Sequence, residues 1–297
     1  MKILIIGSKG FIGLHCLHYF AAVHEVWQCD VVADYVSKNY YIVDATNADY
    51  NDIFQSEKFD ICINCSGAAS VPDSIKNPQR DFTLNVVNVF KQLDAIRKFN
   101  KECKYINISS AAVYGNPKKL PIKESHTLNP ISPYGTHKIM AEQVCQSFFQ
   151  NFGVHTISLR VFSAYGPGLK KQLFWDLYHK MNTNKKVELY GTGEETRDFI
   201  YIKDLLNAID CIINKASFNA EIVNVSNGLE HKIKDVVKFF YKHITPDVDV
   251  IFTGDERKGD PSFWKADITL LKSYGHTQNY SIKKGIKNYI EWLKEIK

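Results

Sequence analysis

The chain has 297 residues, of which 45% are hydrophobic and 23% are charged, and its formal net charge is +5 at neutral pH. This composition predicts a folded protein with a packed core, and the length suits two domains. The positive surplus is spread over the chain without a basic run, which argues against a nucleic-acid-binding protein and suits an anionic small-molecule ligand.

The sequence shows no targeting or membrane signal. The first apolar run, Ile3–Ile6, ends at a glycine and is too short for the core of a signal peptide. No window approaches the ~20 consecutive apolar residues that a transmembrane helix needs. We therefore expect a cytoplasmic protein that does not enter a membrane.

The seven cysteines do not indicate a disulfide framework, because their number is odd and they are scattered along the chain. Cys62 and Cys65 form a C-x-x-C, but they lie in a predicted strand, where residues three apart point to opposite faces. We therefore expect them to pack in the core. The ten histidines show no ligand spacing, so we expect no metal site.

The first 165 residues alternate between strand-like and helix-like segments. The strand-like segments are rich in Ile, Val and Cys and show little period-2 alternation, which is typical of strands covered by helices on both faces. This pattern predicts an α/β fold with a doubly wound parallel sheet, the Rossmann architecture. Strands are expected at 2–6, 25–30, 40–44, 60–65, 104–109 and 155–162, and helices at 11–22, 49–57, 79–99 and 134–152.

The pattern becomes less regular after Gly166. We expect a dinucleotide-binding domain over 1–165, to which the chain returns at about 201–228, and a smaller, mainly helical substrate-binding lobe over most of 166–297. The expected elements are helices at 173–181, 203–215, 233–243, 267–274 and 282–295, and strands at 187–190 and 221–225.

Gly7, Gly10 and Gly13 lie between the first predicted strand and the first predicted helix. The first glycine allows a tight turn, the second lets backbone amides approach a pyrophosphate, and the third lets the helix pack on the strand. The pyrophosphate would then meet the unpaired N–H groups at the helix N-terminus. Asp30 ends the next predicted strand 20 residues after Gly10, as the contact with the adenosine ribose requires. These features predict a dinucleotide cofactor.

The choice between NAD and NADP depends on two residues that point in opposite directions. Asp30 would accept a hydrogen bond from the ribose 2′-hydroxyl and repel a 2′-phosphate, which favours NAD. Lys9, in the glycine loop, would pair with that phosphate, which favours NADP. We expect NAD and keep NADP as the alternative. Asp44, at the end of the third predicted strand, is expected to accept from the adenine amine, although a turn-forming role is the competing interpretation.

Tyr134 and Lys138 lie four residues apart on a predicted helix, and hence on one face. The segment containing Ser109 and Ser110 brings hydroxyls to the carboxyl end of a sheet strand, where such folds bind their ligands. Oxidation of a secondary alcohol needs a base for the hydroxyl proton while hydride leaves the carbon. A nearby ammonium favours the phenolate and brings the pKa of the tyrosine toward the operating pH. This combination predicts an oxidoreductase-type active site.

Six motifs follow one another along the chain: the glycine loop, Asn85, Ser-Ser-Ala-Ala-Val-Tyr-Gly at 109–115, Tyr-Gly-Thr-His-Lys at 134–138, Arg-Val-Phe-Ser-Ala-Tyr-Gly-Pro at 160–167 and Arg-Asp-Phe-Ile-Tyr at 197–201. This is the order found in extended short-chain dehydrogenases/reductases, and the chain resembles the nucleotide-sugar epimerase/dehydratase branch of that family over nearly its whole length.

This resemblance implies a role for each catalytic residue. Tyr134 is the acid/base, Lys138 tunes it and binds the nicotinamide ribose, and Ser110, rather than Ser109, orients the substrate. The resemblance also implies a homodimer and a nucleoside-diphosphate sugar as substrate. Further cofactor contacts are expected from Phe11, Ile12, Ala45, Ser66, Gly67 and Asn85.

Arg197 and the segment that contains Arg257 and Asp260 fall where the family binds the nucleotide and its diphosphate. The chain has only five arginines among 37 basic residues, so two at such motifs favour bidentate phosphate recognition. Structural salt bridges are the alternative. Ser163, where many relatives have Asn, completes the expected substrate-binding residues.

Departures from the family pattern narrow the reaction. Dehydratases carry Asp-Glu directly after the strand hydroxyl, whereas this chain has Ala111 and Ala112, so a 4,6-dehydratase is not expected. Reductases that also epimerise carry a cysteine after the serine, which is absent here too. What remains is redox chemistry at one carbon, which we assign to C4.

Two reactions would use the same residues. A C4 epimerase passes through a 4-keto sugar with transient hydride transfer to bound NAD, and Asp30 favours it. A nucleotide-4-keto-6-deoxysugar reductase uses external NADPH, and Lys9 and the short connection between Asp30 and Asp44 favour it. We expect the epimerase. The alternatives are the reductase and a non-catalytic nucleotide-binding protein of the same fold.

Overall fold

The computed structural model describes residues 1–297 except 184–185, 246–247, 256–258, 260 and 297. Its centre is a parallel seven-stranded sheet with the strand order β11-β6-β5-β4-β1-β2-β3. This order confirms the predicted doubly wound sheet. The strands are β1 (Lys2–Ile6), β2 (Glu25–Asp30), β3 (Tyr40–Ile42), β4 (Ile61–Asn64), β5 (Lys104–Ser110), β6 (Thr156–Val161) and β11 (Asn219–Val225).

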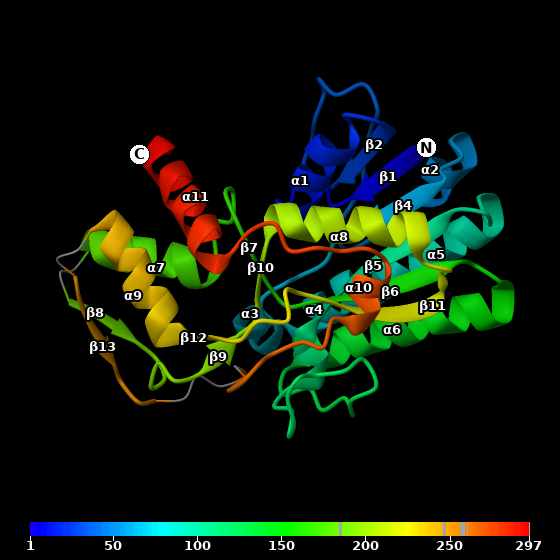
Figure 1. The fold of residues 1–297 in the computed structure, drawn as a ribbon. Coiled ribbons are helices and arrows are strands. Elements are labelled where there is room, and N and C mark those ends of the chain that lie inside the picture. Colours follow the sequence, from blue (N-terminus) through cyan, green and yellow to red (C-terminus); the bar gives the residue numbers. More distant parts are fainter. Residues whose placement is uncertain (184–185, 246–247, 256–258, 260, 297) are drawn as a thin grey trace.

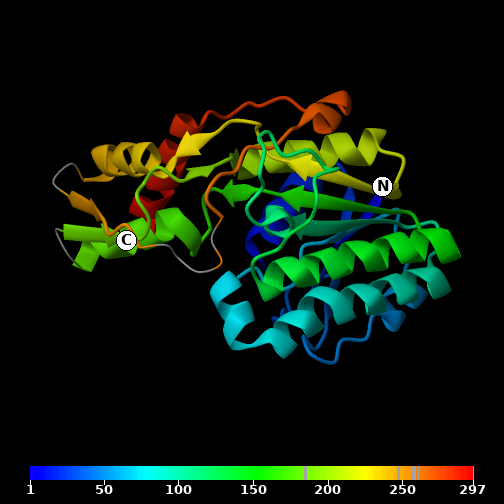
Figure 2. The same cartoon turned by 90° about the horizontal axis from the view of Figure 1, so that it is seen from below.

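Helices cover both faces of this sheet (Figures 1 and 2). Helices α1 (Phe11–Phe20) and α8 (Ile202–Lys215) pack on one face, and α2 (Asn51–Ser56), α5 (Asn88–Phe99) and α6 (Pro133–Phe152) pack on the other. In β1, for example, Ile3 and Ile5 belong to the first core and Leu4 and Ile6 to the second. Both faces are buried, which explains why the strands are apolar at consecutive positions.

The single helix predicted over 79–99 is wrong. The chain instead forms α4 (Pro78–Phe82), a π-helical turn η1 (Thr83–Val87) and then α5. Two asparagine side chains in this stretch bind other segments: Asn85 donates to Ala68 O at 3.1 Å, and Asn88 donates to Ala45 O at 2.8 Å. Wide turns of this kind are frequent at functional sites.

Two further boundaries differ from those predicted. The third strand ends at Ile42 rather than at Asp44, because the Asp44 side chain accepts from the backbone N–H groups of Thr46 and Asn47 and begins a turn. A short helix that the hydrophobic pattern did not indicate, α3 (Val71–Lys76), follows β4. Its N-cap is Ser70, whose hydroxyl accepts from Asp73 N.

The second part of the chain builds a smaller lobe beside the sheet (Figure 1). It contains helices and short two-stranded sheets that pair β13 with β8, β12 with β9, and β10 with β7. No helix in the described part of the chain is both long and apolar enough to span a membrane. The elements are β7 (Ser163–Tyr165), α7 (Gln172–Thr183), β8 (Lys186–Leu189), β9 (Thr196–Arg197), β10 (Phe199–Tyr201), β12 (His231–Lys232), α9 (Ile233–Ile244), β13 (Asp249–Phe252), α10 (Thr269–Ser273) and α11 (Ile282–Glu295).

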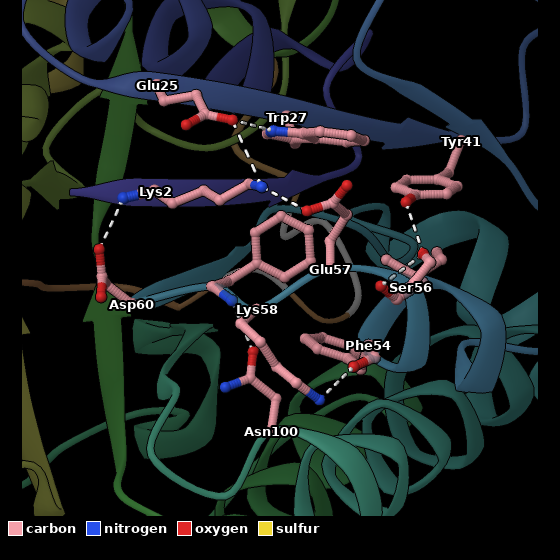
Figure 3. A network of polar contacts seen from close by, with 12 residues as sticks. Lys2, Glu25, Trp27, Tyr41, Phe54, Ser56, Glu57, Lys58, Asp60 and Asn100 are labelled. Atoms are coloured by element: carbon pink, nitrogen blue, oxygen red, sulfur yellow. Dashed lines mark hydrogen bonds and ion pairs between the residues drawn. The ribbon is translucent and has the colours of Figure 1, made fainter.

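The amino ends of the strands are closed by a polar network around Lys2 (Figure 3). Its ammonium pairs with Glu25 at 3.4 Å and with Glu57, and lies 4.7 Å from the centre of the Trp27 ring. Its backbone N–H donates to Asp60 at 2.7 Å. Because the strands are parallel, all their carboxyl ends lie at the opposite edge of the sheet from this network. Sheets of this kind bind their ligands at that edge.

Candidate active site

The turn after β1 has the shape that a dinucleotide phosphate requires. Gly7 has φ +80°, and a Cβ there would lie 2.7 Å from Ser66 N. A Cβ on Gly13 would lie 2.0 Å from Gly7 O, so α1 approaches the turn as closely as backbone allows. Gly10 is the N-cap of α1, and no described side chain caps this helix. The first N–H groups of α1 are therefore available for an anion, and the residues fit the pyrophosphate.

Asp30 ends β2 beside this turn and is almost fully buried. Its carboxylate accepts from the backbone N–H groups of Lys9 at 2.8 Å and Val31 at 2.7 Å. The glycine turn therefore fixes the carboxylate that was predicted to meet the ribose.

Lys9 does not lie as the NADP interpretation requires. Its ammonium pairs with the carboxylate of Asp34, in the loop after β2, and lies 5.1 Å from the centre of the Tyr40 ring. The hydrogen bond from Lys9 and those from backbone N–H groups hold the pKa of Asp34 well below its usual range. Asp30 and Asp34 thus place two carboxylates at this end of β2, which disfavours a 2′-phosphate and suits NAD.

The loop after β4 is tied to the π-helical turn. The Ser66 hydroxyl donates to Asn64 Oδ1 at 2.5 Å. Gly67 has φ +111°, and a Cβ there would lie 2.6 Å from Asn85 Oδ1. That oxygen is buried and has no hydrogen-bond partner among the described atoms. Asn85 therefore has an unpaired acceptor beside Gly67, and both residues were predicted to contact the cofactor.

Asp44 and Ala45 lie farther along this edge. Asp44 is exposed and accepts from Thr46 N at 2.7 Å and Asn47 N at 2.9 Å, and these bonds lower its pKa. This is the turn-forming role that competed with adenine binding in the sequence. Ala45 O accepts from Asn88. The adenine contact of Asp44 remains a prediction.

Tyr134 and Lys138 lie in the first two turns of α6, which begins after the N-cap Ser132 and Pro133. Tyr134 is 9% exposed and Lys138 is 5% exposed. The Lys138 ammonium donates to Ile108 O, in β5, at 2.8 Å and lies 5.9 Å from the centre of the Tyr134 ring. The i,i+4 pair therefore faces the carboxyl end of β5.

Ser109 and Ser110 point in different directions, as neighbours in a strand must. Ser110 ends β5 and accepts from Ala112 N at 3.2 Å, and its hydroxyl lies near enough to the Tyr134 phenol to lower the pKa of that phenol. Ser109 is buried and donates to Glu142 at 2.5 Å. Ser110 is thus the hydroxyl that shares a site with Tyr134, and its role in orienting the substrate remains a prediction.

The ionisation of the pair differs from the simple expectation. Burial raises the pKa of Tyr134 to about 12, and the hydrogen bond with Ser110 only partly opposes it. Burial also lowers the pKa of Lys138 to about 8, against the nearby charges of Asp81 and Glu142. The sequence led us to expect an acidified phenol. Burial instead has the largest effect on the phenol and favours its protonated form.

A buried polar network connects β5 and β6 to the helix that contains Tyr134 and Lys138. Arg160, in β6, binds both carboxylate oxygens of Glu142, at 3.0 and 2.7 Å, and donates to the hydroxyl of Tyr114 at 2.8 Å. Tyr114 in turn donates to Asn224, in β11, at 2.7 Å. The motif around Arg160 gives no sign of these partners, because they lie 18 and 46 residues away along the chain.

The predicted substrate-binding residues fall into two groups. Ser163 begins β7 and is half-buried, and its N–H donates to Asp198 O at 3.1 Å. Arg197 donates to Thr196 O at 2.8 Å, and its guanidinium lies 5.6 Å from the centre of the Trp264 ring. Trp264 donates to Gly115 O at 3.1 Å, which connects this group to the end of the 109–115 motif.

Arg257 and Asp260 lie outside the described residues. Gly259, between them, lies close enough to α3 that a Cβ on it would be 2.7 Å from Val71 Cγ1.

Phe11 and Ile12 lie in the first turn of α1 and are half-buried. Phe11 packs edge-on against His15, whose ring nitrogen lies 2.8 Å from Pro167 O. The turn after β7 therefore contacts the helix that begins at the glycine loop, and it connects the two parts of the chain at the predicted cofactor site.

Comparisons with known proteins give one family. Residues 3–226 match the model of the NAD dependent epimerase/dehydratase family. A putative UDP-glucose 4-epimerase of Methanocaldococcus jannaschii is 27% identical over 98% of each chain.

Solved structures are similar over the full length. A UDP-N-acetylglucosamine 4-epimerase from Methanobrevibacter ruminantium, in complex with UDP-N-acetylmuramic acid, is 26% identical with a TM-score of 0.89, covering 100% of this chain and 99% of that one. A UDP-glucuronic acid 4-epimerase from Bacillus cereus, in complex with UDP-glucuronic acid and NAD, has a TM-score of 0.90 at 24% identity over 100% of both chains. At that identity it supports the fold.

Proposed function

The chain belongs to the NAD-dependent epimerase/dehydratase family, and on this premise we propose that it is a nucleoside-diphosphate-sugar C4 epimerase. The observation that carries the proposal is that Ser110, at the carboxyl end of β5, lies beside Tyr134 and Lys138 in the first two turns of α6, where Lys138 donates to Ile108 O of the same strand at 2.8 Å. Relatives named as UDP-sugar 4-epimerases support a UDP-sugar as the substrate class.

The residues of the glycine turn and the end of β2 would hold the cofactor. The N–H groups at the start of α1 would bind the pyrophosphate and Asp30 would accept from the adenosine ribose. Lys138 would bind the nicotinamide ribose with its ammonium. NAD held there would supply a reversible hydride acceptor for C4 of the sugar.

Tyr134 supplies the proton chemistry. Its phenolate accepts the proton of the 4-hydroxyl while the carbon loses hydride, and its phenol returns that proton when the hydride comes back to the opposite face of the 4-keto sugar. The Ser110 hydroxyl forms a hydrogen bond with the same substrate oxygen and so keeps it next to Tyr134. In this proposal the pKa of Tyr134 falls from about 12 only when positive charge is brought to the site with the cofactor.

The neighbouring positions restrict the chemistry to one carbon. Ala111 is fully buried directly after Ser110, and Ala112 follows it. Neither side chain can donate or accept a proton, so elimination of water at an adjacent carbon has no acid at these positions. This supports epimerisation over dehydration.

The ion pair between Lys9 and Asp34 argues against the NADPH-dependent reductase, because it occupies the lysine that favoured that reaction. The contact of Ser110 with Tyr134 argues against a non-catalytic protein, because such proteins have no need to keep it.

We also propose a homodimer. Phe90 on α5 and Phe152 on α6 are 52% and 43% exposed, and Phe90 packs edge-on against Phe148. In a two-fold symmetric dimer, this apolar face would pack against the same face of a second copy of the chain. Phe90→Glu is expected to convert a dimer to a monomer in light scattering, and a wild-type monomer would contradict the proposal.

The function is tested by analysing the nucleotide in the purified protein and then supplying UDP-sugars. We expect tightly bound NAD, and conversion of UDP-glucose, UDP-N-acetylglucosamine or UDP-glucuronic acid to its C4 epimer in NMR spectra without net consumption of NAD. An empty site that binds NADPH and consumes it with a 4-keto sugar would instead establish the reductase.

A further inference from the structure

Asp81 and His137 form a pair that is packed against the catalytic helix. Asp81 lies on α4 and is 1% exposed, and its Oδ2 lies 2.6 Å from Nδ1 of His137. His137 precedes Lys138 on α6 and packs edge-on against Phe82. An ionised carboxylate only accepts hydrogen bonds, so the imidazole donates its Nδ1–H. This bond holds the Asp81 carboxylate against the first turns of α6.

Four groups, from three parts of the chain, act on the charge of Lys138: Asp81 on α4, Glu142 and Cys145 on α6, and Cys65 after β4. Neither cysteine forms a disulfide, and burial raises the pKa of Cys145 to about 12. Tyr134, on the same helix, is a protonated phenol. The charge of Lys138 therefore depends on the two carboxylates.

These two carboxylates differ in what surrounds them. Glu142 is matched by Arg160, which binds both of its oxygens, and it also accepts from Ser109. Asp81 is bound to His137 through Oδ2, and its Oδ1 is buried without a hydrogen-bond partner among the described atoms. The negative charge of Asp81 is therefore less compensated than that of Glu142, and it acts through a region that water does not screen.

Lys138 needs such a counter-charge, because a buried ammonium loses its hydration and tends to lose its proton. A neutral lysine would donate fewer hydrogen bonds to a ribose and would not favour a phenolate at Tyr134. Burial lowers the pKa of Lys138 to about 8, near physiological pH, even though Asp81 and Glu142 oppose the decrease. A small further decrease would leave the site with the wrong charge.

We propose that Asp81, held by His137, is a positioning residue whose negative charge keeps Lys138 in its ammonium form. The proposal rests on the proposed function for the part that Lys138 plays in turnover, but the charge relationship itself can be measured without a sugar substrate.

The test uses the pH dependence of NAD binding to the full chain from pH 6 to 10. In the wild type, we expect affinity to decrease near pH 8 as Lys138 loses its proton, and Lys138→Met should lack this step. Asp81→Asn keeps the shape and a hydrogen-bond acceptor but removes the charge. It is expected to move the step about one pH unit lower.

Two variants serve as controls. Asp81→Glu keeps the charge and is expected to leave the step within the range of the wild type. Asp73→Asn removes an exposed carboxylate on the adjacent helix α3, where it pairs with Arg80, and should leave the step unchanged. If Asp81→Asn does not fold, Asp81→Ser removes the same charge with a smaller side chain and is measured instead.

Turnover gives a second measurement. In Asp81→Asn, kcat is expected to be near wild-type at pH 6.5 and about tenfold lower at pH 8.5, since each pH unit changes the ammonium fraction up to tenfold. A folded neutral variant whose NAD-binding step stays at the wild-type pH would overturn the proposal. A loss of activity that is equal at all pH values would show a purely structural role. If no sugar is turned over but the step moves, the charge relationship holds and the proposed function fails.

Discussion

Lys9 and Asp34 form an ion pair between the glycine turn and the loop that follows β2. Asp30 ends that strand and is bonded to the backbone of Lys9. A 2′-phosphate on the adenosine ribose would meet two carboxylates and a lysine that is already paired. We therefore propose that this ion pair contributes to the choice of NAD over NADP.

Asp34→Asn is expected to raise the affinity for NADP about tenfold relative to NAD, which corresponds to about 1.4 kcal/mol. The change releases the Lys9 ammonium and removes one negative charge. Fluorescence titration with both cofactors gives the ratio of dissociation constants. Asp176→Asn, which breaks an exposed Asp–Lys pair in the smaller lobe, is the matched control. An unchanged ratio in Asp34→Asn would show that the pair has no part in cofactor choice.

Tyr134→Phe is expected to lower kcat by about 10²- to 10⁴-fold, because the phenol is the group that moves the substrate proton. The NAD dissociation constant should change less than about threefold, since the ring is retained and Lys138 keeps its bond to Ile108 O. Single-turnover kinetics and equilibrium NAD binding separate the two effects. Parallel loss of binding and activity would mean that the tyrosine is structural.

Ser109 and Ser110 provide a matched pair of substitutions in adjacent positions. Ser110→Ala should lower kcat by about 10²-fold with little effect on stability, because it removes a donor aimed at the reacting oxygen. Ser109→Ala should lower the free energy of unfolding by about 1–3 kcal/mol, because Glu142 loses a buried donor. Its kcat should remain near wild-type. Urea unfolding and steady-state kinetics check both, and the reverse pattern would exchange the two roles.

The sheet and the catalytic motifs were predictable because their signals are local. Strands such as Lys2–Ile6 consist mostly of consecutive apolar residues, and Gly7, Gly10 and Gly13 lie within seven consecutive residues. The pair Tyr134–Lys138 needs only the helical period. Such patterns can be recognised in the sequence because they depend only on residues that are near one another in the chain.

The supporting contacts of the site were not predictable, because their partners are distant in the chain. Ser109 and Glu142 are 33 residues apart, and Asp81 and His137 are 56 apart. A single sequence gives no signal for such pairs. The break in the helix over 79–99 was missed for the same reason, since Asn85 and Asn88 bind segments that precede them by 17 and 43 residues.

Asp198 lies between β9 and β10 and is fully buried. It connects this part of the chain to the residue after β11 and to the segment before α10. Its carboxylate accepts from the Ser226 hydroxyl at 2.7 Å and from Ala266 N at 2.9 Å. Burial raises its pKa to about 6, and these hydrogen bonds only partly oppose the increase. The protonated form is therefore more favoured in the folded chain than in the unfolded chain, where an aspartate has a pKa of about 3.9.

The sign of the pH effect follows from these two pKa values. Between about pH 4 and pH 6 the folded state binds more protons at Asp198 than the unfolded state, so its contribution to stability is complete below pH 4 and decreases as the pH rises through 6. The total loss is about 3 kcal/mol, from about 1.4 kcal/mol per pKa unit. Asp198→Asn cannot titrate, so the difference in free energy of unfolding between wild type and variant should change by that amount in favour of the variant from pH 4 to pH 7. Urea unfolding of both proteins at each pH measures it, because the other groups cancel in the difference. A difference that stays constant would mean that folding does not raise the pKa of Asp198.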